Sequence, residues 1–189
     1  MSVSRSSHHA ASSEDLEVVP GGVRDVPTVF ERGRRRPTID GVVMVPAVVQ
    51  ADHRGSLMET VNFDEPFWEE PIVYAYTFTV APGRIKGWGM HKLQTDRYAV
   101  LGGPLRVVLY DGRPASQTFQ QIAEFSFGDR APGFIRIPPG VWHADQNVGD
   151  VPSTVINFPT RPYDRDDPDK YRIDPASGEI PFDFSLSDG

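Results

Sequence analysis

Two histidines in similar sequence settings are the residues of this chain best suited to acid–base chemistry. His91 lies in the stretch 83–103 and His143 in the stretch 133–147, and each stretch combines a run typical of a β-strand with a tight turn. The other three histidines lie in the N-terminal leader and beside Arg54. Because imidazole changes its charge near neutral pH, two such rings could move protons or hold a metal ion. The repeated setting predicts that both histidines face one pocket.

The residues around both histidines follow the two signature motifs of the cupin barrels. The second motif, Pro-x-Gly-x-x-His-x-x-x-Asn, is matched by Pro138, Gly140, His143 and Asn147. The first motif is matched by Gly83, His91, Asp96 and Gly103, with Gly89 in the position of its first histidine. The sequence therefore resembles a cupin that lacks one of the family's metal ligands.

The composition agrees with the fold that this resemblance implies. A chain of 189 residues suits one domain with a buried core. Its 18 prolines and 17 glycines favour many short strands and turns over long helices. The expected fold class is all-β, a double-stranded β-helix or jelly-roll barrel of the cupin type. Residues 1–37 are predicted to be a flexible leader and an extended arm, residues 38–160 the barrel, and residues 161–189 a C-terminal extension packing over it.

Several phrases narrow the resemblance to the dTDP-4-dehydrorhamnose 3,5-epimerases. The stretch DHRGSLME, at 52–59, resembles the family phrase D-x-R-G-x-F-x-E, in which the arginine meets the nucleotide diphosphate; Leu57 replaces the aromatic residue. The phrases IKGW, HKLQTDR and NFPTRPY resemble an epimerase-related subgroup, in which Tyr163, Asp169 and Arg172 recur. The resemblance covers residues 39–184.

This resemblance implies an isomerase that inverts a centre next to the ketone of a nucleotide-linked 4-keto-6-deoxy sugar. Removing the hydrogen at C3 or C5 gives an enolate, which requires a base, a hydrogen-bond donor or a cation at the enolate oxygen and an acid on the opposite ring face. By family position His91 is the expected base, oriented by Asp174. Arg97 is expected at the enolate oxygen, with Lys86 and Lys92 nearby.

Further residues are expected to bind the substrate. They are Arg54, Glu59, Tyr76, Trp88, Lys92, His143, Asn157 and Tyr163. Asn157 falls near the position of the family's acid tyrosine, and an amide cannot deliver a proton. Either Tyr163, Tyr98 or Tyr76 supplies the proton, or one centre alone is inverted, or the reaction differs.

Two other classes of function stay open. A repurposed metal cupin, an oxygenase or cyclase, would hold Fe(II), Mn or Zn through His91, His143 and either Asp96 or Gln94. A non-catalytic ligand-binding cupin would keep the barrel without turnover. The epimerase resemblance itself implies no metal and no other cofactor.

The expected partners follow from the resemblance and the charge. The resemblance implies a dTDP-type nucleotide-linked keto sugar and a homodimer. The net charge of -7 argues against a general nucleic-acid surface. No apolar run approaches the ~20 residues that span a bilayer, and the N-terminus lacks the apolar core of a signal peptide. We therefore expect a cytoplasmic protein that binds no membrane.

Overall fold

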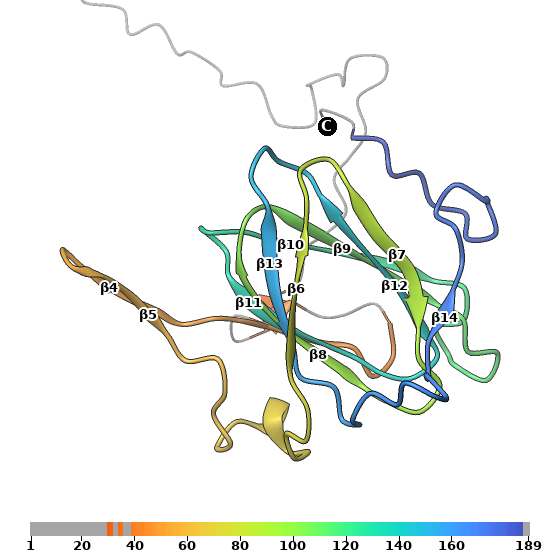
Figure 1. The fold of residues 1–189 in the computed structure, drawn as a ribbon, viewed down its shortest axis with the longest axis horizontal. Coiled ribbons are helices and arrows are strands. Elements are labelled where there is room, and N and C mark those ends of the chain that lie inside the picture. The colour runs from red at the N-terminus through yellow and green to blue at the C-terminus, as the bar shows by residue number, and fades with distance from the viewer. Residues whose placement is uncertain (1–29, 32–33, 36–38, 187–189) are drawn as a thin grey trace, which may run out of the picture.

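Two five-stranded antiparallel sheets face each other and form the body of the protein (Figure 1). The structure is a computed structural model that describes residues 30–31, 34–35 and 39–186. The first sheet has the order β10-β9-β12-β7-β14 and the second the order β3-β11-β8-β13-β6. The predicted all-β jelly-roll fold is confirmed.

The bounds of the strands are as follows. The first sheet contains β7 (Ile85–Met90), β9 (Leu105–Asp111), β10 (Ile122–Phe127), β12 (Val141–Asn147) and β14 (Tyr171–Arg172). The second contains β3 (Val43–Pro46), β6 (Tyr76–Val80), β8 (Asp96–Gly102), β11 (Gly133–Ile137) and β13 (Ser153–Asn157).

The interior between the sheets has an apolar part and a polar part. Side chains on a strand point alternately to its two faces, so every second residue enters the interior. Strands β9, β10 and β11 supply mainly apolar inward residues, including Leu105, Val107, Leu109, Phe125 and Ile135. Strands β8 and β12 instead bury polar groups, including Asp96, Tyr98, His143 and Asp145. The polar part is where chemistry can take place.

A hairpin extends away from the two sheets. It consists of β4 (Val49–Asp52) and β5 (Gly55–Met58), which pair with each other and with no other described strand (Figure 1). All four residues of β4 are exposed. The chain then forms the short 3-10 helix η2 (Pro66–Trp68), whose Phe67 and Trp68 pack on the outer face of the second sheet with Phe134 and Phe158.

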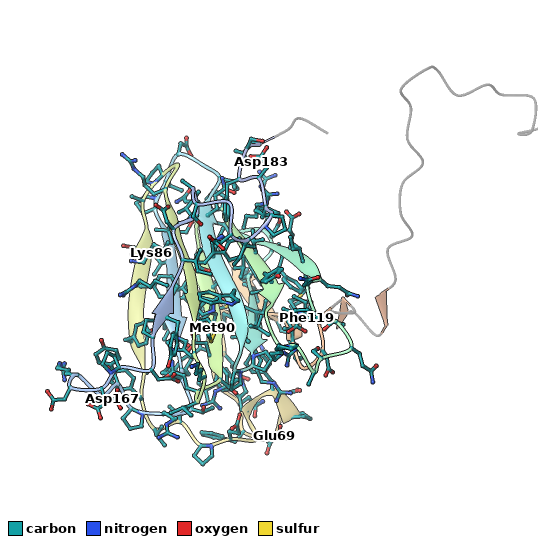
Figure 2. The ribbon with its side chains drawn as sticks, turned by 90° about the vertical axis from the view of Figure 1, so that its right-hand side faces the viewer. Glu69, Lys86, Met90, Phe119, Asp167 and Asp183 are labelled. Carbon is teal, nitrogen blue, oxygen red and sulfur yellow. The ribbon has the colours of Figure 1, made fainter. Side chains whose placement is uncertain are left out.

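The C-terminal segment runs along the outside of β7. Figure 2 shows it passing from the loop with Asp167 at one end of the barrel to Asp183 at the other. Strand β14 pairs with the end of β7, and Trp88 and Ile173 exchange backbone hydrogen bonds of 2.9 and 3.1 Å. The Trp88 ring then packs against Phe184, with centroids 5.4 Å apart. These contacts fix the segment against the strand that leads to His91.

Most of the predicted leader and arm lies outside the described residues. Within residues 1–37, only β1 (Phe30–Glu31) and β2 (Arg34–Arg35) are described, and they pair as a short antiparallel hairpin. None of the helices in the described ranges has the length and apolar character needed to cross a membrane.

Candidate active site

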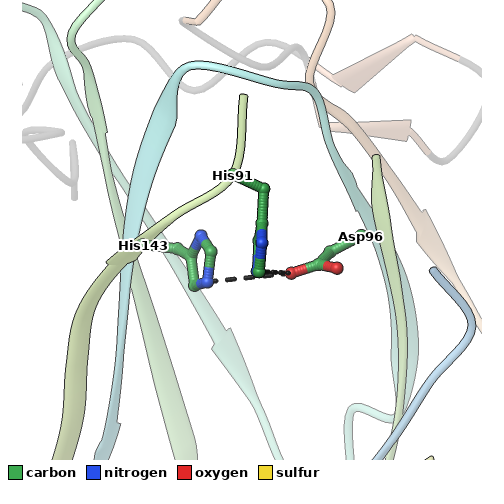
Figure 3. Close-up of side chains that lie close together, drawn as sticks. All are labelled: His91, Asp96 and His143. Carbon is green, nitrogen blue, oxygen red and sulfur yellow. Dashed lines mark ion pairs between the residues drawn. The ribbon is translucent and has the colours of Figure 1, made fainter. Parts of the chain in front are cut away.

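Three buried side chains converge in the polar part of the interior (Figure 3). His91 follows β7, Asp96 begins β8 and His143 lies on β12. Both histidine Nε2 atoms approach the same oxygen of Asp96, His91 at 3.4 Å and His143 at 3.7 Å. The two imidazole rings are nearly parallel, with centroids 5.7 Å apart. The structure thus brings the two motif histidines into one site.

Backbone contacts explain the other residues of the second motif. Gly140 has a φ of 81°, which favours glycine, and its amide donates to the carbonyl oxygen of His91 at 2.8 Å. The Asn147 side-chain amide donates to the carbonyl oxygens of Val80 and Val151 at 2.8 and 2.7 Å. Both residues position β12, so that His143 reaches the His91 segment.

Asp169 in the C-terminal segment holds the loop that carries His91. Its carboxylate accepts hydrogen bonds from the backbone amides of Lys92, Leu93 and Gln94 at 2.9, 2.8 and 3.3 Å. Its carbonyl oxygen is in close contact with Nδ1 of His91. Because a carbonyl oxygen can only accept, Nδ1 carries the proton and Nε2 of a neutral His91 is left as the basic nitrogen.

Lys170, the next residue, projects into the site. Its Nζ lies 3.3 Å from Nε2 of His91. A Cβ placed on Gly89 would lie 2.6 Å from this Nζ, so the lysine occupies the space that a side chain at position 89 would need. Burial lowers the pKa of Lys170, and the nearby carboxylates of Asp96 and Asp145 oppose this by favouring the ammonium.

The ionisation of the converging groups follows from their burial and their neighbours. Burial, helped by the charge of Lys170, lowers the pKa of His143 to about 3, so this imidazole is neutral at physiological pH. Burial would raise the pKa of Asp96, but the adjacent imidazoles, which become cations as the pH falls, outweigh it and hold that pKa below its ordinary value. Oδ2 of Asp96 and both ring nitrogens of His143 have no hydrogen-bond partner among the described residues. These polar atoms are available to a ligand.

Two adjoining cavities open beside these groups. The inner one, of about 360 Å³, includes Phe78, Lys86, Tyr98, His143 and Asp145 in its lining. The outer one, of about 350 Å³, includes Tyr74, His91, Gln94, Arg161 and Tyr163. Both are also lined by Tyr76, Lys170 and Arg172. Each volume lies within the range of small-molecule sites, and Lys170 stands between the two cavities.

Asp145 is a second acid of the site with one unpartnered oxygen. It is buried two residues beyond His143 on the same inward face of β12, and its Oδ1 has no hydrogen-bond partner among the described side chains and backbone. Burial raises its pKa to about 7, although the charge of Lys170 opposes the rise. A carboxyl group with this pKa can exist protonated near neutral pH, and so can act as an acid.

Arg97 does not reach the site, which corrects its predicted position at the enolate oxygen. It follows the inward Asp96 on β8 and therefore faces the opposite side of the sheet. Its guanidinium donates to the carbonyl oxygens of Glu70, Pro71 and Phe158 at 2.6, 3.0 and 2.9 Å. Arg97 anchors the outer η2 layer to the barrel.

Asp174 is also not where the sequence prediction placed it. It is exposed, and its carboxylate accepts from the backbone amide of Ala176 at 2.9 Å in a turn. Among the described residues, the carboxylate within ion-pair distance of the His91 ring is that of Asp96. Asp169 orients His91, through its carbonyl oxygen. The sequence predicted that one residue, Asp174, would supply a carboxylate and orient His91. In the structure Asp96 supplies the carboxylate and Asp169 orients the ring.

Four predicted substrate-binding residues lie apart from the three converging side chains. Arg54 is at the turn of the projecting hairpin, where it pairs with Asp52 at 2.6 Å, and Glu59 is exposed just after the same hairpin. Lys92 is exposed, with its Nζ over the Tyr171 ring. Trp88 borders the inner cavity, but its ring packs with the C-terminal segment. None of these four side chains is a hydrogen-bond or ion-pair partner of His91.

Tyr76, Asn157 and Tyr163 lie closer to the chemistry. The Asn157 side-chain amide donates to the Tyr76 hydroxyl at 2.9 Å, and Tyr76 lines both cavities. Burial, followed by the charge of Asp96, raises the pKa of Tyr76 to about 12. Tyr163 is half exposed in the outer cavity. Tyr76 is therefore a weaker acid than Asp145.

The sequence analysis missed two of the site's charged groups, Asp145 and Lys170. Asp145 carried a usable signal, because a residue two positions after an inward histidine on a strand also faces inward. Lys170 carried none, since the segment 161–189 has no hydrophobic period that would place it against β7.

The site contains three side chains that could hold a metal ion. Nitrogen or oxygen atoms of His91, Asp96 and His143 lie within 4.8 Å of one another, and their types suit Fe(II), Mn or Zn. However, the ammonium of Lys170 lies where the fourth ligand of the cupin motif would project from Gly89. A divalent cation at these donors would adjoin that ammonium, and like charges in a buried site repel strongly. The residues as arranged do not fit a resident metal.

The fold and the paired motif histidines define the protein as a cupin. A protein-family model described as the polysaccharide biosynthesis C-terminal domain matches residues 50–171. The chain belongs to this family and has the fold of the RmlC-like dTDP-sugar epimerases, which confirms the resemblance found in the sequence.

Two curated proteins and one solved structure illustrate the relationship. The chain is 37% identical over 139 residues to the "Probable low-salt glycan biosynthesis epimerase Agl13" of Haloferax volcanii, covering 72% of this chain and 88% of that protein. It is 33% identical over 147 residues to the "Spore coat polysaccharide biosynthesis protein SpsL" of Bacillus subtilis, covering 78% and 97%. A dTDP sugar isomerase from Desulfovibrio desulfuricans G20 superposes with a TM-score of 0.73 and 29% identity, over 78% of this chain and 93% of that one.

The raised pKa of Asp145 predicts how Asp145→Asn changes stability with pH. The folded protein holds this proton up to about pH 7, whereas the unfolded chain releases it near the ordinary value of 3.8. The contribution of this Asp145 proton to the free energy of unfolding of the native protein is therefore complete below about pH 4. It is lost as the pH rises towards 7. The free energy of unfolding of Asp145→Asn, relative to the native protein, should rise across this window by at most about 1.4 kcal/mol per pH unit.

Urea unfolding of both proteins at several pH values measures this difference. The exposed Gln121→Ala, which removes no ionisable group, serves as a control that should give a flat difference. A difference for Asp145→Asn that does not change between about pH 4 and 7 would contradict the assignment.

Proposed function

We propose that this protein is an epimerase that inverts a carbon next to the ketone of a nucleotide-linked 4-keto-6-deoxy sugar. The observation that carries the proposal is the environment of His91. Its Nδ1 is held by the Asp169 carbonyl, and its Nε2 is beside a buried carboxylate and a partly buried ammonium. A neutral imidazole fixed in this way is suited to remove a carbon-bound hydrogen.

The proton transfer would use the groups of both cavities. Nε2 of His91 takes the hydrogen from the carbon next to the ketone, and the bonding electron pair moves onto the ketone oxygen to give the enolate. The imidazolium that forms is stabilised by the Asp96 carboxylate, 3.4 Å away. Asp145, which lines the inner cavity, then donates a proton to the other face of the same carbon. Asp145 would thus do the work of the acid tyrosine that Asn157 replaces.

The comparisons and the outer cavity support a sugar nucleotide as the substrate. The related proteins are described as an epimerase of glycan biosynthesis and a dTDP sugar isomerase. The outer cavity contains Arg161 and Arg172, whose guanidinium groups suit a diphosphate, and Tyr74 and Tyr163, whose rings could stack on a base. A dTDP-linked keto sugar would place its sugar beside His91 and its diphosphate towards these arginines.

The first test of this function is hydrogen exchange at the sugar. The native protein, incubated with a dTDP-4-keto-6-deoxyglucose pool in deuterated water, should introduce deuterium next to the ketone, as mass spectrometry and NMR would detect. His91→Asn should lower the rate at least about 100-fold, because the base is removed. An unchanged melting temperature would show that the variant is folded. Exchange at the native rate in His91→Asn would refute the assignment of the base.

Asp145→Asn should retain deuterium exchange and lose inversion of configuration. With the acid removed, His91 can still take a proton and return deuterium to the same face, so the substrate becomes labelled without changing configuration. We expect label in the unreacted substrate to persist while inversion falls about 100-fold or more. Asp129→Asn, an exposed substitution outside both cavities, should leave both rates unchanged. Parallel loss of exchange and inversion in a folded Asp145→Asn would contradict this role.

We also infer that the protein is a homodimer. The projecting hairpin supports this, because it exposes apolar side chains to solvent, including Val48, Val49 and Leu57. Clustered exposed apolar side chains commonly mark a contact surface. Sedimentation equilibrium should give twice the chain mass of 21.0 kDa, and Leu57→Asp should shift the protein towards monomer. A native protein that sediments as a monomer at micromolar concentration would overturn the inference.

A further inference from the structure

Lys170 occupies a position that the cupin motif assigns to a metal ligand. The first motif would place a histidine at position 89, where this chain has Gly89. A Cβ at that position would lie 2.6 Å from Nζ of Lys170 and 3.1 Å from Nε2 of His143. The ammonium therefore lies among the remaining motif side chains, with His91 Nε2 3.3 Å away. The Lys170 ammonium thus occupies the space that a histidine side chain at position 89 would need.

The C-terminal segment holds this ammonium in place from both sides. Before it, Asp169 is tied to the loop after His91 by three backbone amides and by its own carbonyl oxygen. After it, Tyr171 and Arg172 pair with Met90 and Gly89 of β7. Because the backbone on both sides of Lys170 is already fixed, only the rotamers of its side chain must be ordered to place the ammonium in the site.

Lys170 supplies a positive charge close to two buried carboxyl groups. Asp96 and Asp145 are both buried, and each is electrostatically coupled to Lys170. A buried carboxylate is costly unless a positive charge accompanies it. In a metal-dependent cupin the metal ion would supply that charge, and here an ammonium is present instead. The two ring nitrogens of His143 have no hydrogen-bond partner among the described residues, as expected of a ligand whose metal has been replaced.

We propose that Lys170 takes the place of the cupin metal ion and acts as a catalytic residue whose ammonium binds the ketone oxygen of the substrate. As the hydrogen leaves the neighbouring carbon, the electron pair moves onto this oxygen, and the fixed positive charge stabilises the enolate. The lysine keeps its proton throughout, so no further reactant is required. The enolate role rests on the proposed epimerase function, whereas the replacement of the metal does not.

The replacement can be tested with a metal ion alone. Lys170→Ala removes the ammonium and leaves His91, Asp96 and His143 free to bind one Co²⁺ per chain, as titration calorimetry and the visible spectrum of Co²⁺ would detect. We expect the native protein to bind at least about tenfold more weakly, because the ammonium repels the ion. Lys170→Ala with His143→Ala should lose the site again. Equally tight Co²⁺ binding by the native protein would overturn the replacement, as would failure of a folded Lys170→Ala to bind.

The enolate role is tested by exchange. Lys170→Met keeps much of the length and removes the charge, so deuterium incorporation and inversion should both fall at least about 100-fold at an unchanged melting temperature. Gly89→Ala is a second variant that retains the lysine. Its Cβ would displace the ammonium, and we expect at least a tenfold loss of exchange. Native exchange rates in either folded variant would overturn the role.

The Co²⁺-binding test and the deuterium-exchange test can give negative results independently of each other. If the native protein exchanges no sugar hydrogen, the proposed epimerase function and the enolate role are both overturned, and Co²⁺ binding still decides whether Lys170 replaces the metal. If the native protein exchanges but Lys170→Met does so equally well, the epimerase function stands and the role of Lys170 is overturned.

Discussion

The contact between Asp169 and the loop after β7 is the interaction on which the rest of the site depends. One carboxylate satisfies three backbone amides of the loop 92–94, and the carbonyl oxygen of the same residue fixes the proton on Nδ1 of His91. Because Lys170 is the next residue, the hydrogen bonds that orient the base also deliver the cation. The barrel supplies the histidines and acids, and the C-terminal segment gives them a defined arrangement.

The barrel can hold such a site because its polar and apolar interiors lie side by side. Strands β9, β10 and β11 fill one part with aliphatic and aromatic side chains, whose burial stabilises the sheets. The stability gained there offsets the cost of burying Asp96 and Asp145 beside the ammonium of Lys170. The neighbours of these two buried groups separate their pKa values. Asp96 is held below its ordinary pKa by the imidazoles, while the pKa of Asp145 rises to about 7. Two carboxyl groups in one interior can therefore be a permanent anion and an acid.

The fold and the two histidines could be predicted from the sequence because local constraints determine them. Gly140 must adopt a positive φ and Asn147 must close the end of β12, so their spacing to His143 is fixed by the backbone. The placement of Arg97 could also have been derived, since it follows the inward Asp96 on a strand and must face out. The contribution of Lys170 could not be derived, because it depends on how a segment without periodic pattern docks on β7.

A site assembled by an irregular segment explains why one barrel can serve different chemistries. The side chains of His91, Asp96 and His143 would suit a metal ion if a fourth ligand stood at position 89 and no lysine entered. With glycine there, the same three side chains surround an ammonium. An ammonium can stabilise an enolate through charge and hydrogen bonds, but it has no redox states and no exchangeable coordination positions. The pair formed by Gly89 and Lys170 therefore limits the chemistry of the barrel to proton transfer, whereas the fold by itself does not.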